Sequence, residues 1–414
     1  MSLTRRGLLA AGALLLAPPA RAGDGAGLRL AIVGAGVAGS SAAFALRRLL
    51  PGASIDVFEP LPAYHACFGA NQALAGWLDD GALLHRHEAI RAAGMGLRVE
   101  GVERIDLDGE RPRIAGTAYD HAVIAAGISI RPPDYEGYDP AVLPPFWTAG
   151  ESILPLRERI DALDDGANVV LLAPPAPYRC PPAPYERATA IAARLKARGK
   201  RGRIAILDAK SSFPKQALFE DAWRRLYPGM IEWYPVEAIG RILRLDLGAK
   251  RVETETGAFA FDLLHVVPPQ RAGAVAGNSG LVDATGWVPV AGAGFRTAVS
   301  PRISAVGDAC IPGDMPKSAF SARAQALLMA GTLAAEWLGR AAPPADLFNT
   351  CYSRLSADET VIVGGSYGIV DGRIKAREGF ISKVGESAQQ RRANRDEGAA
   401  WIAEFSRTVF EGEG

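Results

Sequence analysis

Residues 28–39 read LRLAIVGAGVAG, an apolar run that ends in three glycines spaced as G-x-G-x-x-G. A helical pattern follows from Ser40 to Leu50, then a second short strand from Ser54 to Phe58, and then Glu59. The order is strand, glycine turn, helix, strand and acid. A glycine motif in this setting predicts a Rossmann-type unit that binds a dinucleotide.

Each residue of the motif has a physical role in such a unit. Gly34 and Gly36 permit the tight turn and the close approach of a pyrophosphate to the helix N-terminus. Gly39 completes the motif and is expected to serve the same dinucleotide site. The carboxylate of Glu59 is expected to accept hydrogen bonds from the adenosine ribose hydroxyls. The motif alone does not distinguish FAD from NAD.

Two later segments favour FAD. Residues 119–127, YDHAVIAAG, read as a strand that runs into a glycine turn at Ala126 and Gly127. Residues 303–306 form another short strand, which Gly307 and Asp308 follow. Three motifs in this order resemble the two-dinucleotide flavoproteins typified by glutathione reductase, in which the late aspartate contacts the ribityl and pyrophosphate part of FAD.

A second α/β unit is predicted between these motifs. Residues 168–172 and 203–207 are buried strands by composition, and a helical segment from Tyr185 to Ala197 separates them. The loop after the first of these strands reads APPAPYRCPP, residues 173–182. Because prolines lack the amide hydrogens that cradle a phosphate, this loop predicts that the unit keeps the fold but does not bind a nicotinamide cofactor.

The predicted fold class is therefore α/β, with two Rossmann-like three-layer dinucleotide-binding domains and a small α+β C-terminal domain. The expected boundaries are a discontinuous FAD-binding domain over residues 28–149 and 270–340, a second Rossmann-like domain over 150–269, and a C-terminal interface domain over 341–414.

Bulk composition narrows the class of function. The chain has 414 residues, a formal net charge of +1 and no long block of like charge. A balanced charge gives no electrostatic footprint for nucleic acid or for an acidic lipid surface. We expect neither nucleic acid as a partner nor stable insertion into a membrane.

The first 22 residues read as an export signal. Arg5 and Arg6 precede an apolar run from Leu8 to Leu16, and the segment closes with Ala20-Arg21-Ala22, an A-x-A-like end. The paired arginines indicate the twin-arginine route, which exports folded proteins and would carry a bound cofactor across. A short anchor or a tail is the alternative. We expect a periplasmic protein.

Several uncommon strings carry a more specific resemblance. The chain is similar, over essentially its whole mature length, to the flavin-binding subunit of flavocytochrome c sulfide dehydrogenase. The matching strings are YHAC at 64–67, YRCPPAPYER at 178–187, PPQRAG at 268–273, GDACI at 307–311, MPKS at 315–318 and NTCYS at 349–353.

The resemblance implies roles for three of the four cysteines. Cys67 falls where the family attaches FAD covalently, although a free cysteine is more often a small buried apolar side chain. Cys180 and Cys351 match the family's redox-active disulfide beside the flavin. The residues alone leave the pairing open, and a structural link between the second and third domains is the competing interpretation. Cys310 is expected to be a packed free thiol.

Two charged residues are further candidates. Glu186, at the start of a predicted helix, can serve as a proton acceptor for sulfide or a persulfide, or merely complement the helix dipole. Lys317 can stabilise a reduced flavin at the ring edge, or lie in an exposed turn. The five histidines show no metal-ligand spacing, so we expect no metal site.

The function that the resemblance implies is FAD-dependent oxidation of sulfide to sulfur or polysulfide. The chain has no C-x-x-C-H haem-attachment string, so the electrons are expected to pass to a separate c-type cytochrome. One alternative is a sulfide:quinone oxidoreductase, which would need an amphipathic, membrane-seeking C-terminus. Another is an electron-transfer or maintenance flavoprotein that does not turn over sulfide. Which cysteine is attacked first stays open.

Overall fold

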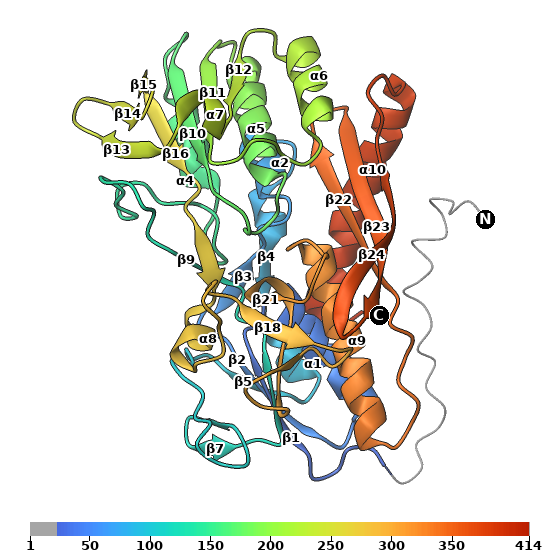
Figure 1. Cartoon of the computed structure of the whole chain (residues 1–414). Helices are drawn as coiled ribbons and strands as arrows, with labels where there is room; N and C mark the ends of the chain where they lie inside the picture. Colours follow the sequence, from blue (N-terminus) through green and yellow to red (C-terminus); the bar gives the residue numbers. More distant parts are fainter. Residues whose placement is uncertain (1–22, 414) are drawn as a thin grey trace.

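The computed structural model describes residues 23–413, so the predicted export signal at 1–22 lies outside the described residues. The chain folds into three α/β or α+β parts. Figure 1 shows the first mainly in blue and light orange, the second in green and yellow, and the third in deep orange and red. The α/β fold with two Rossmann-like parts is as predicted.

The first part is built on an eight-stranded sheet with the order β21-β18-β19-β20-β8-β1-β2-β5. Its parallel half places β1 between β2 and β8, so the glycine turn lies at the centre of the sheet. The strands are β1 (Arg29–Val33), β2 (Ser54–Phe58), β5 (Gly96–Arg98), β8 (His121–Ile124), β18 (Val288–Ala291), β19 (Arg296–Thr297), β20 (Ile303–Ala305) and β21 (Cys310–Ile311). Strands β1 to β8 precede the second part in the sequence, and strands β18 to β21 follow it.

Helix α1 (Val37–Leu49) follows β1 and packs against α9 (Ala319–Trp337). It begins three residues before the predicted Ser40, directly after Gly36. A Cβ on Gly39 would lie 1.7 Å from the carbonyl oxygen of Gly34, so only glycine permits this approach of helix to turn. Gly34 itself has φ +101°, a conformation that favours glycine.

The second part holds a parallel sheet with the order β12-β11-β10-β16. Along β10 (Asn168–Ala173), Val169 and Leu171 join the core under helix α5 (Ala183–Ala197), whereas Val170 and Leu172 join a separate apolar cluster. The other strands are β11 (Arg203–Asp208), β12 (Ile231–Tyr234) and β16 (Leu263–Val266). Both faces of the sheet are therefore buried, which explains the unbroken apolar sequence.

Helices and a small antiparallel sheet cover the two faces of this parallel sheet. The covering elements are α4 (Leu154–Asp161), α6 (Gln216–Leu226), α7 (Val236–Ile239), β13 (Ile242–Asp246), β14 (Arg251–Thr254) and β15 (Gly257–Ala260). Two antiparallel strands, β9 (Ile128–Ile130) and β17 (Gln270–Ala272), carry the chain from the first part to the second and back.

The C-terminal part is an antiparallel sheet of β22 (Leu347–Arg354), β23 (Thr360–Val370) and β24 (Arg373–Ile381), followed by α10 (Ala388–Ser406). Strand β22 packs on α9 of the first part, and α10 packs on β23. Within residues 23–413, no helix is both long and apolar enough to cross a bilayer.

Short elements complete the chain. They are β3 (Ala63–His65), α2 (Ala70–Ala75), η3 (Asp80–Leu83), β4 (Leu84–Arg86), α3 (Glu88–Ala92), β6 (Arg113–Ile114), β7 (Thr117–Ala118), α8 (Ala274–Asn278), η4 (Gly307–Ala309) and η5 (Arg407–Glu411).

Candidate active site

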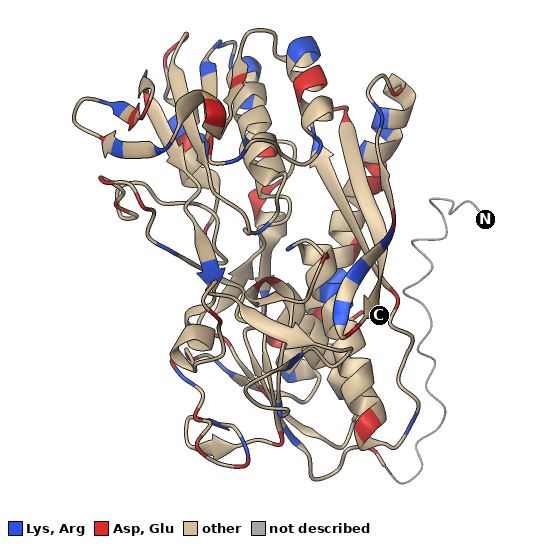
Figure 2. Cartoon of the chain, viewed as in Figure 1, with Lys and Arg blue, Asp and Glu red and all other residues tan. Residues whose placement is uncertain are grey.

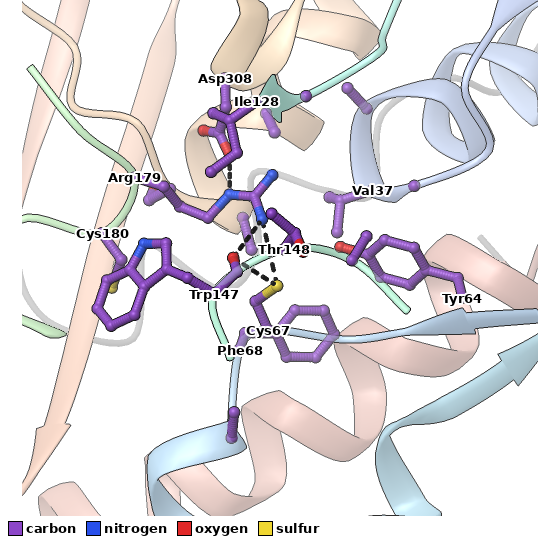
Figure 3. Close-up of a pocket in the computed structure, with 18 of the residues that line it drawn as sticks. Val37, Tyr64, Cys67, Phe68, Ile128, Trp147, Thr148, Arg179, Cys180 and Asp308 are labelled. Atoms are coloured by element: carbon purple, nitrogen blue, oxygen red, sulfur yellow. Dashed lines mark hydrogen bonds and ion pairs between the residues drawn. The ribbon is translucent and has the colours of Figure 1, made fainter. Parts of the chain in front are cut away.

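A cavity of about 430 Å³ lies where the three parts of the fold meet. Its walls run from the glycine turn after β1, past the segment around Cys67, to the loop after β10 and to strand β22. Figure 3 shows the middle of this cavity, with Arg179 extended between Asp308 and Cys67. The site is thus assembled from segments far apart in sequence.

The end of the cavity beside β1 has the features of a dinucleotide site. Gly34 and Gly36 line it, and so does Glu59, whose Oε2 accepts a hydrogen bond from the Ala35 amide at 2.8 Å. No side chain caps the N-terminus of α1, so its first amide groups are available to a phosphate. Gly39 does not line the cavity, and its role is the close packing of α1 described above.

The two later motifs line the same cavity. Ala126 and Gly127 form its wall at the end of β8, and Asp308 lines it as well. Asp308 Oδ2 accepts a hydrogen bond from Arg179 Nε at 2.7 Å. Asp308 Oδ1 is buried and has no partner among the described residues. A buried oxygen without a partner indicates a group that is still to bind there.

These residues fit FAD. Glu59 would receive the ribose, the α1 N-terminus the pyrophosphate, and Asp308 the ribityl hydroxyls. The largely apolar inner part of the cavity, where the cysteines lie, would receive the flavin ring.

Cys67 lies in this inner part. Arg179 Nη1 donates a hydrogen bond to its sulfur at 3.2 Å and to the Trp147 carbonyl at 3.2 Å, as Figure 3 shows. Burial raises the pKa of the Cys67 thiol, and the Arg179 guanidinium partly offsets that rise. The thiol therefore faces the cavity beside a fixed positive charge.

Cys180 and Cys351 lie beside each other at the wall of the cavity, where each changes the pKa of the other. Both are described as free thiols. Cys180 occupies the proline loop after β10 with φ +53°, a conformation that costs a non-glycine residue on the order of 1–3 kcal/mol. Cys351 occupies regular strand β22. The fold thus brings a loop cysteine of the second part against a strand cysteine of the third.

The two thiols have different electrostatic surroundings. The hydrogen bond from Cys180 and the nearby ammonium of Lys215 hold the pKa of Cys351 below its ordinary value, despite burial. Donation to Cys351, together with burial, raises the pKa of Cys180 well above its ordinary value. The Lys215 ammonium in contact with Cys351 Sγ therefore favours Cys351 as the sulfur that carries negative charge in the dithiol state.

Glu186 lines the same wall from the first turn of α5. Its Oε1 accepts a hydrogen bond from the Arg354 amide at 2.7 Å, and its Oε2 accepts one from Asn71 Nδ2 at 3.3 Å. Burial raises the pKa of this carboxyl to about 7. Glu186 can therefore take up or release a proton near neutral pH.

Lys317 is placed differently from the prediction. Its Nζ donates to the carbonyl oxygens of Asp308 at 2.8 Å and Cys310 at 2.7 Å, and it lies 3.7 Å from the centre of the Trp287 ring. It lines a second, smaller cavity rather than the one described above. We correct the sequence-based interpretation: Lys317 braces the loop after β20, because its ammonium is already satisfied by backbone oxygens. The buried thiol of Cys310 donates to the Gly307 carbonyl, as expected of a packed residue.

Sequence reasoning did not identify several polar residues of the site. Arg187 Nε donates to Asn71 Oδ1 at 2.9 Å, and its guanidinium lies 4.7 Å from the centre of the Trp147 ring. Arg179 and Arg187 both lie in the string YRCPPAPYER at 178–187, so the sequence offered a signal for these two residues. Lys215 carried no signal, since it follows a proline in an ordinary turn.

The fold and the cavity define the class of protein as a flavoprotein oxidoreductase with two dinucleotide-binding folds. Three solved structures share the fold. A sulfide:quinone oxidoreductase from the hyperthermophilic bacterium Aquifex aeolicus has a TM-score of 0.74 and 17% identity, and the match covers 93% of this chain and 92% of that one. An NAD-dependent persulfide reductase from A. fulgidus has a TM-score of 0.62 and 15% identity, with coverages of 90% and 77%, and a water-forming NADH oxidase from Lactobacillus brevis has a TM-score of 0.61 and 15% identity, with coverages of 91% and 91%.

Two family models identify the particular group. One describes the central region of the flavoprotein chain of sulfide dehydrogenase (flavocytochrome c) and matches residues 154–268. The other describes the flavin-binding region of flavocytochrome c sulphide dehydrogenase and matches residues 343–410. The chain belongs to the flavocytochrome c sulfide dehydrogenase flavoprotein family, and its cofactor is FAD.

Proposed function

We propose that this protein oxidises sulfide to sulfur or polysulfide through a redox-active disulfide between Cys180 and Cys351, and passes the electrons through FAD to a c-type cytochrome. The observation that carries the proposal is the contact of these two sulfurs at the wall of the cavity that bears the dinucleotide motifs. Membership of a family named for flavocytochrome c and sulfide supports the substrate and the acceptor.

The cysteine pair supplies the chemistry that acts on sulfide. Hydrosulfide attacks one sulfur of the disulfide; a new S–S bond forms, the old one breaks, and the displaced cysteine leaves as a thiolate. The sulfide sulfur is oxidised and the displaced cysteine sulfur is reduced. A second hydrosulfide then attacks the outer sulfur of the persulfide and removes it as a chain of two sulfurs.

Glu186 handles the proton in this scheme. A carboxyl with a pKa of about 7 exists in both forms at neutral pH, so it can accept a proton from incoming sulfide or persulfide. When bound, FAD would accept two electrons from the cysteine pair and release them one at a time. Arg179 and Asp308 hold each other at the middle of the cavity, where they would fix the position of the cofactor.

Covalent attachment of FAD through Cys67 is part of the proposal. The thiol lies in the cavity, its sulfur accepts a hydrogen bond from Arg179, and the guanidinium favours the thiolate that would form the bond. A thioether would keep the cofactor on a protein that has left the cytoplasm. Export to the periplasm by the twin-arginine route is proposed on the sequence of residues 1–22. A protein that stays in the cytoplasmic fraction with Arg5 still at its N-terminus would contradict it.

The proposal is tested by anaerobic titration with sulfide, followed by the loss of flavin absorbance. The wild type is expected to bleach, whereas Cys180→Ser and Cys351→Ser are expected to keep FAD and lose bleaching by at least about a hundredfold in rate. Cys310→Ser is the matched control, because Cys310 is buried outside the cavity, and it should bleach normally. Bleaching at the wild-type rate in both active-site variants would refute the scheme.

The same preparation distinguishes the electron acceptors. With sulfide as donor, the proposal predicts turnover with cytochrome c and none with a short-chain quinone. Turnover with quinone alone would favour a sulfide:quinone oxidoreductase. Failure to turn over with either would favour an electron-transfer or maintenance flavoprotein.

A further inference from the structure

We infer that Lys215 stabilises the Cys351 thiolate and thereby directs sulfide to Cys180, so that the persulfide forms on Cys180 and Cys351 is the leaving sulfur. This inference rests on the proposed function. It assigns a role to a residue outside the dinucleotide motifs and the cysteine strings, and it resolves which sulfur is attacked.

The side chain of Lys215 is held firmly against β22. Its Nζ donates to Ser353 Oγ at 2.7 Å, to the Cys351 carbonyl at 3.1 Å and to Cys351 Sγ at 3.8 Å. The residue is 5% exposed, and its backbone has φ +64° immediately before α6. The left-handed conformation and the three contacts together fix an ammonium beside one particular sulfur.

The charges around the pair are arranged unequally. Lys215 reaches the pair from the segment before α6 and donates to Cys351. Glu186 and Arg187 face the pair from α5, and the Glu186 carboxylate disfavours negative charge on both sulfurs, so it does not distinguish them. An ammonium in contact with a buried sulfur favours its thiolate. Lys215 contacts Cys351 directly, and this contact is what distinguishes the two sulfurs.

This asymmetry decides the direction of disulfide opening. In thiol–disulfide exchange, the sulfur that is the more stable thiolate leaves faster. Hydrosulfide therefore attacks Cys180 Sγ; the new S–S bond forms there, the Cys180–Cys351 bond breaks, and the bonding pair remains on Cys351. Lys215 neutralises the charge that develops on Cys351.

The first test uses the reduced holoprotein and needs no turnover. Iodoacetamide alkylation is followed at each cysteine by peptide mass spectrometry across a pH series. In the wild type, Cys351 should react as a thiolate below the pH of an ordinary cysteine. In Lys215→Met, its alkylation midpoint should rise by about one pH unit or more.

Lys210→Met is the matched control. Lys210 is a partly buried lysine of the same part of the fold, but its Nζ binds the Pro174 carbonyl and Asp208 instead of a sulfur. Its loss should leave the Cys351 midpoint unchanged. If Lys215→Met does not fold, Lys215→Gln keeps a polar side chain for Ser353 and repeats the measurement without the charge. An unchanged midpoint in the neutral variants overturns the inference.

The second test locates the persulfide. One equivalent of sulfide is added anaerobically to the oxidised protein, and the products are trapped with iodoacetamide. The wild type should carry the extra sulfur on Cys180 and an alkylated Cys351, and Lys215→Met should carry it on both cysteines. A persulfide found on Cys351 in the wild type overturns the inference.

The two levels of the account fail separately. A Lys215-dependent midpoint in a protein that does not react with sulfide contradicts the proposed function alone. Normal sulfide-driven bleaching, together with a Cys351 alkylation midpoint that does not change when Lys215 is replaced, contradicts the role of Lys215 alone.

Discussion

Cys180 and Cys351 differ in backbone as well as in charge. The loop cysteine has a left-handed backbone, held by hydrogen bonds from its amide to the Lys317 carbonyl and from the Ala183 amide to its own carbonyl. Its partner lies in a regular strand beside Lys215. Under the proposed mechanism, backbone geometry holds the sulfur that sulfide would attack, and charge stabilises the sulfur that would leave.

Replacement of Cys67 by serine should convert the flavin from covalent to dissociable. The rest of the cavity is unchanged, so the protein should still bind FAD on purification. Intact mass under denaturing conditions should show one added FAD in the wild type and none in Cys67→Ser, whereas Cys310→Ser should keep it. A denatured wild type without added mass would contradict covalent attachment through Cys67.

Glu186 should make stability depend on pH. Its folded-state pKa, about 7, is above the unfolded value of 4.5, so the folded state binds more protons between these values. Stability should therefore fall as pH rises from about 4.5 to 7, by an amount on the order of 2–3 kcal/mol.

The Glu186→Gln variant has no ionisable group there and should lack this part of the pH dependence. Urea unfolding of both proteins across that range measures the difference. A constant difference in the free energy of unfolding between the wild type and the variant would contradict the raised pKa of Glu186.

At the level of single residues, the sequence predicted those that belong to contiguous strings. Glu59 and Asp308 follow predicted strands, and both line the cavity. Lys317 was misplaced because a string does not show that backbone carbonyls already surround an ammonium. Lys215 and Asn71 were missed, since each becomes significant only through contacts with segments distant in sequence.

The turn between β1 and α1 is the structural element on which cofactor binding depends. Gly39→Ala should displace α1 from the turn, because the new Cβ would fall 1.7 Å from the Gly34 carbonyl oxygen. We expect loss of FAD and destabilisation by at least about 3 kcal/mol, as overpacking at a rigid contact is costly.

Gly277→Ala is the control for that substitution. Gly277 lies in helix α8 with nothing near its Cβ position, so alanine there should be neutral or stabilising by up to about 1 kcal/mol. Flavin content and thermal unfolding measure both variants. A Gly39→Ala protein with full flavin and wild-type stability would contradict the role assigned to this turn.

The elements themselves were largely predictable. The strands at 29–33, 54–58 and 168–173 coincide with apolar runs, and α5 begins at Ala183, two residues before the predicted start. Helices α1 and α5 both begin before their predicted first residues. Each follows directly on a loop of the candidate site, which ends at Gly36 before α1 and at Pro182 before α5. Apolar periodicity does not reveal such starts, because turn residues determine them.

At the scale of the molecule, the cysteine pair exists only because the second and third parts of the fold are held together. The buried guanidinium of Arg391 on α10 lies 3.9 Å from Asp221 of α6 and 3.6 Å from Glu359 of the turn before β23. Figure 2 shows that both α6 and α10 carry acidic and basic residues. This cluster braces α6, and with it Lys215, against the sheet that carries Cys351.

The assembly of the site could not be predicted from the sequence, because it depends on contacts between separate parts of the fold. The order of motifs predicts which parts are present, but the approach of Cys180 to Cys351 depends on how β22 packs on α9 and on the ion pair between Arg391 of α10 and Asp221 of α6. Sequence reasoning took the pairing of the cysteines from a family resemblance, because spacing alone does not determine it.

The most direct test of the central claim is peptide mapping of the oxidised, full-length protein with and without reduction. The account predicts a linked pair of peptides that contain Cys180 and Cys351, which disappears on reduction and re-forms when an electron acceptor is supplied. A protein that retains both as free thiols after oxidation, or that links either one to Cys310, would contradict the account.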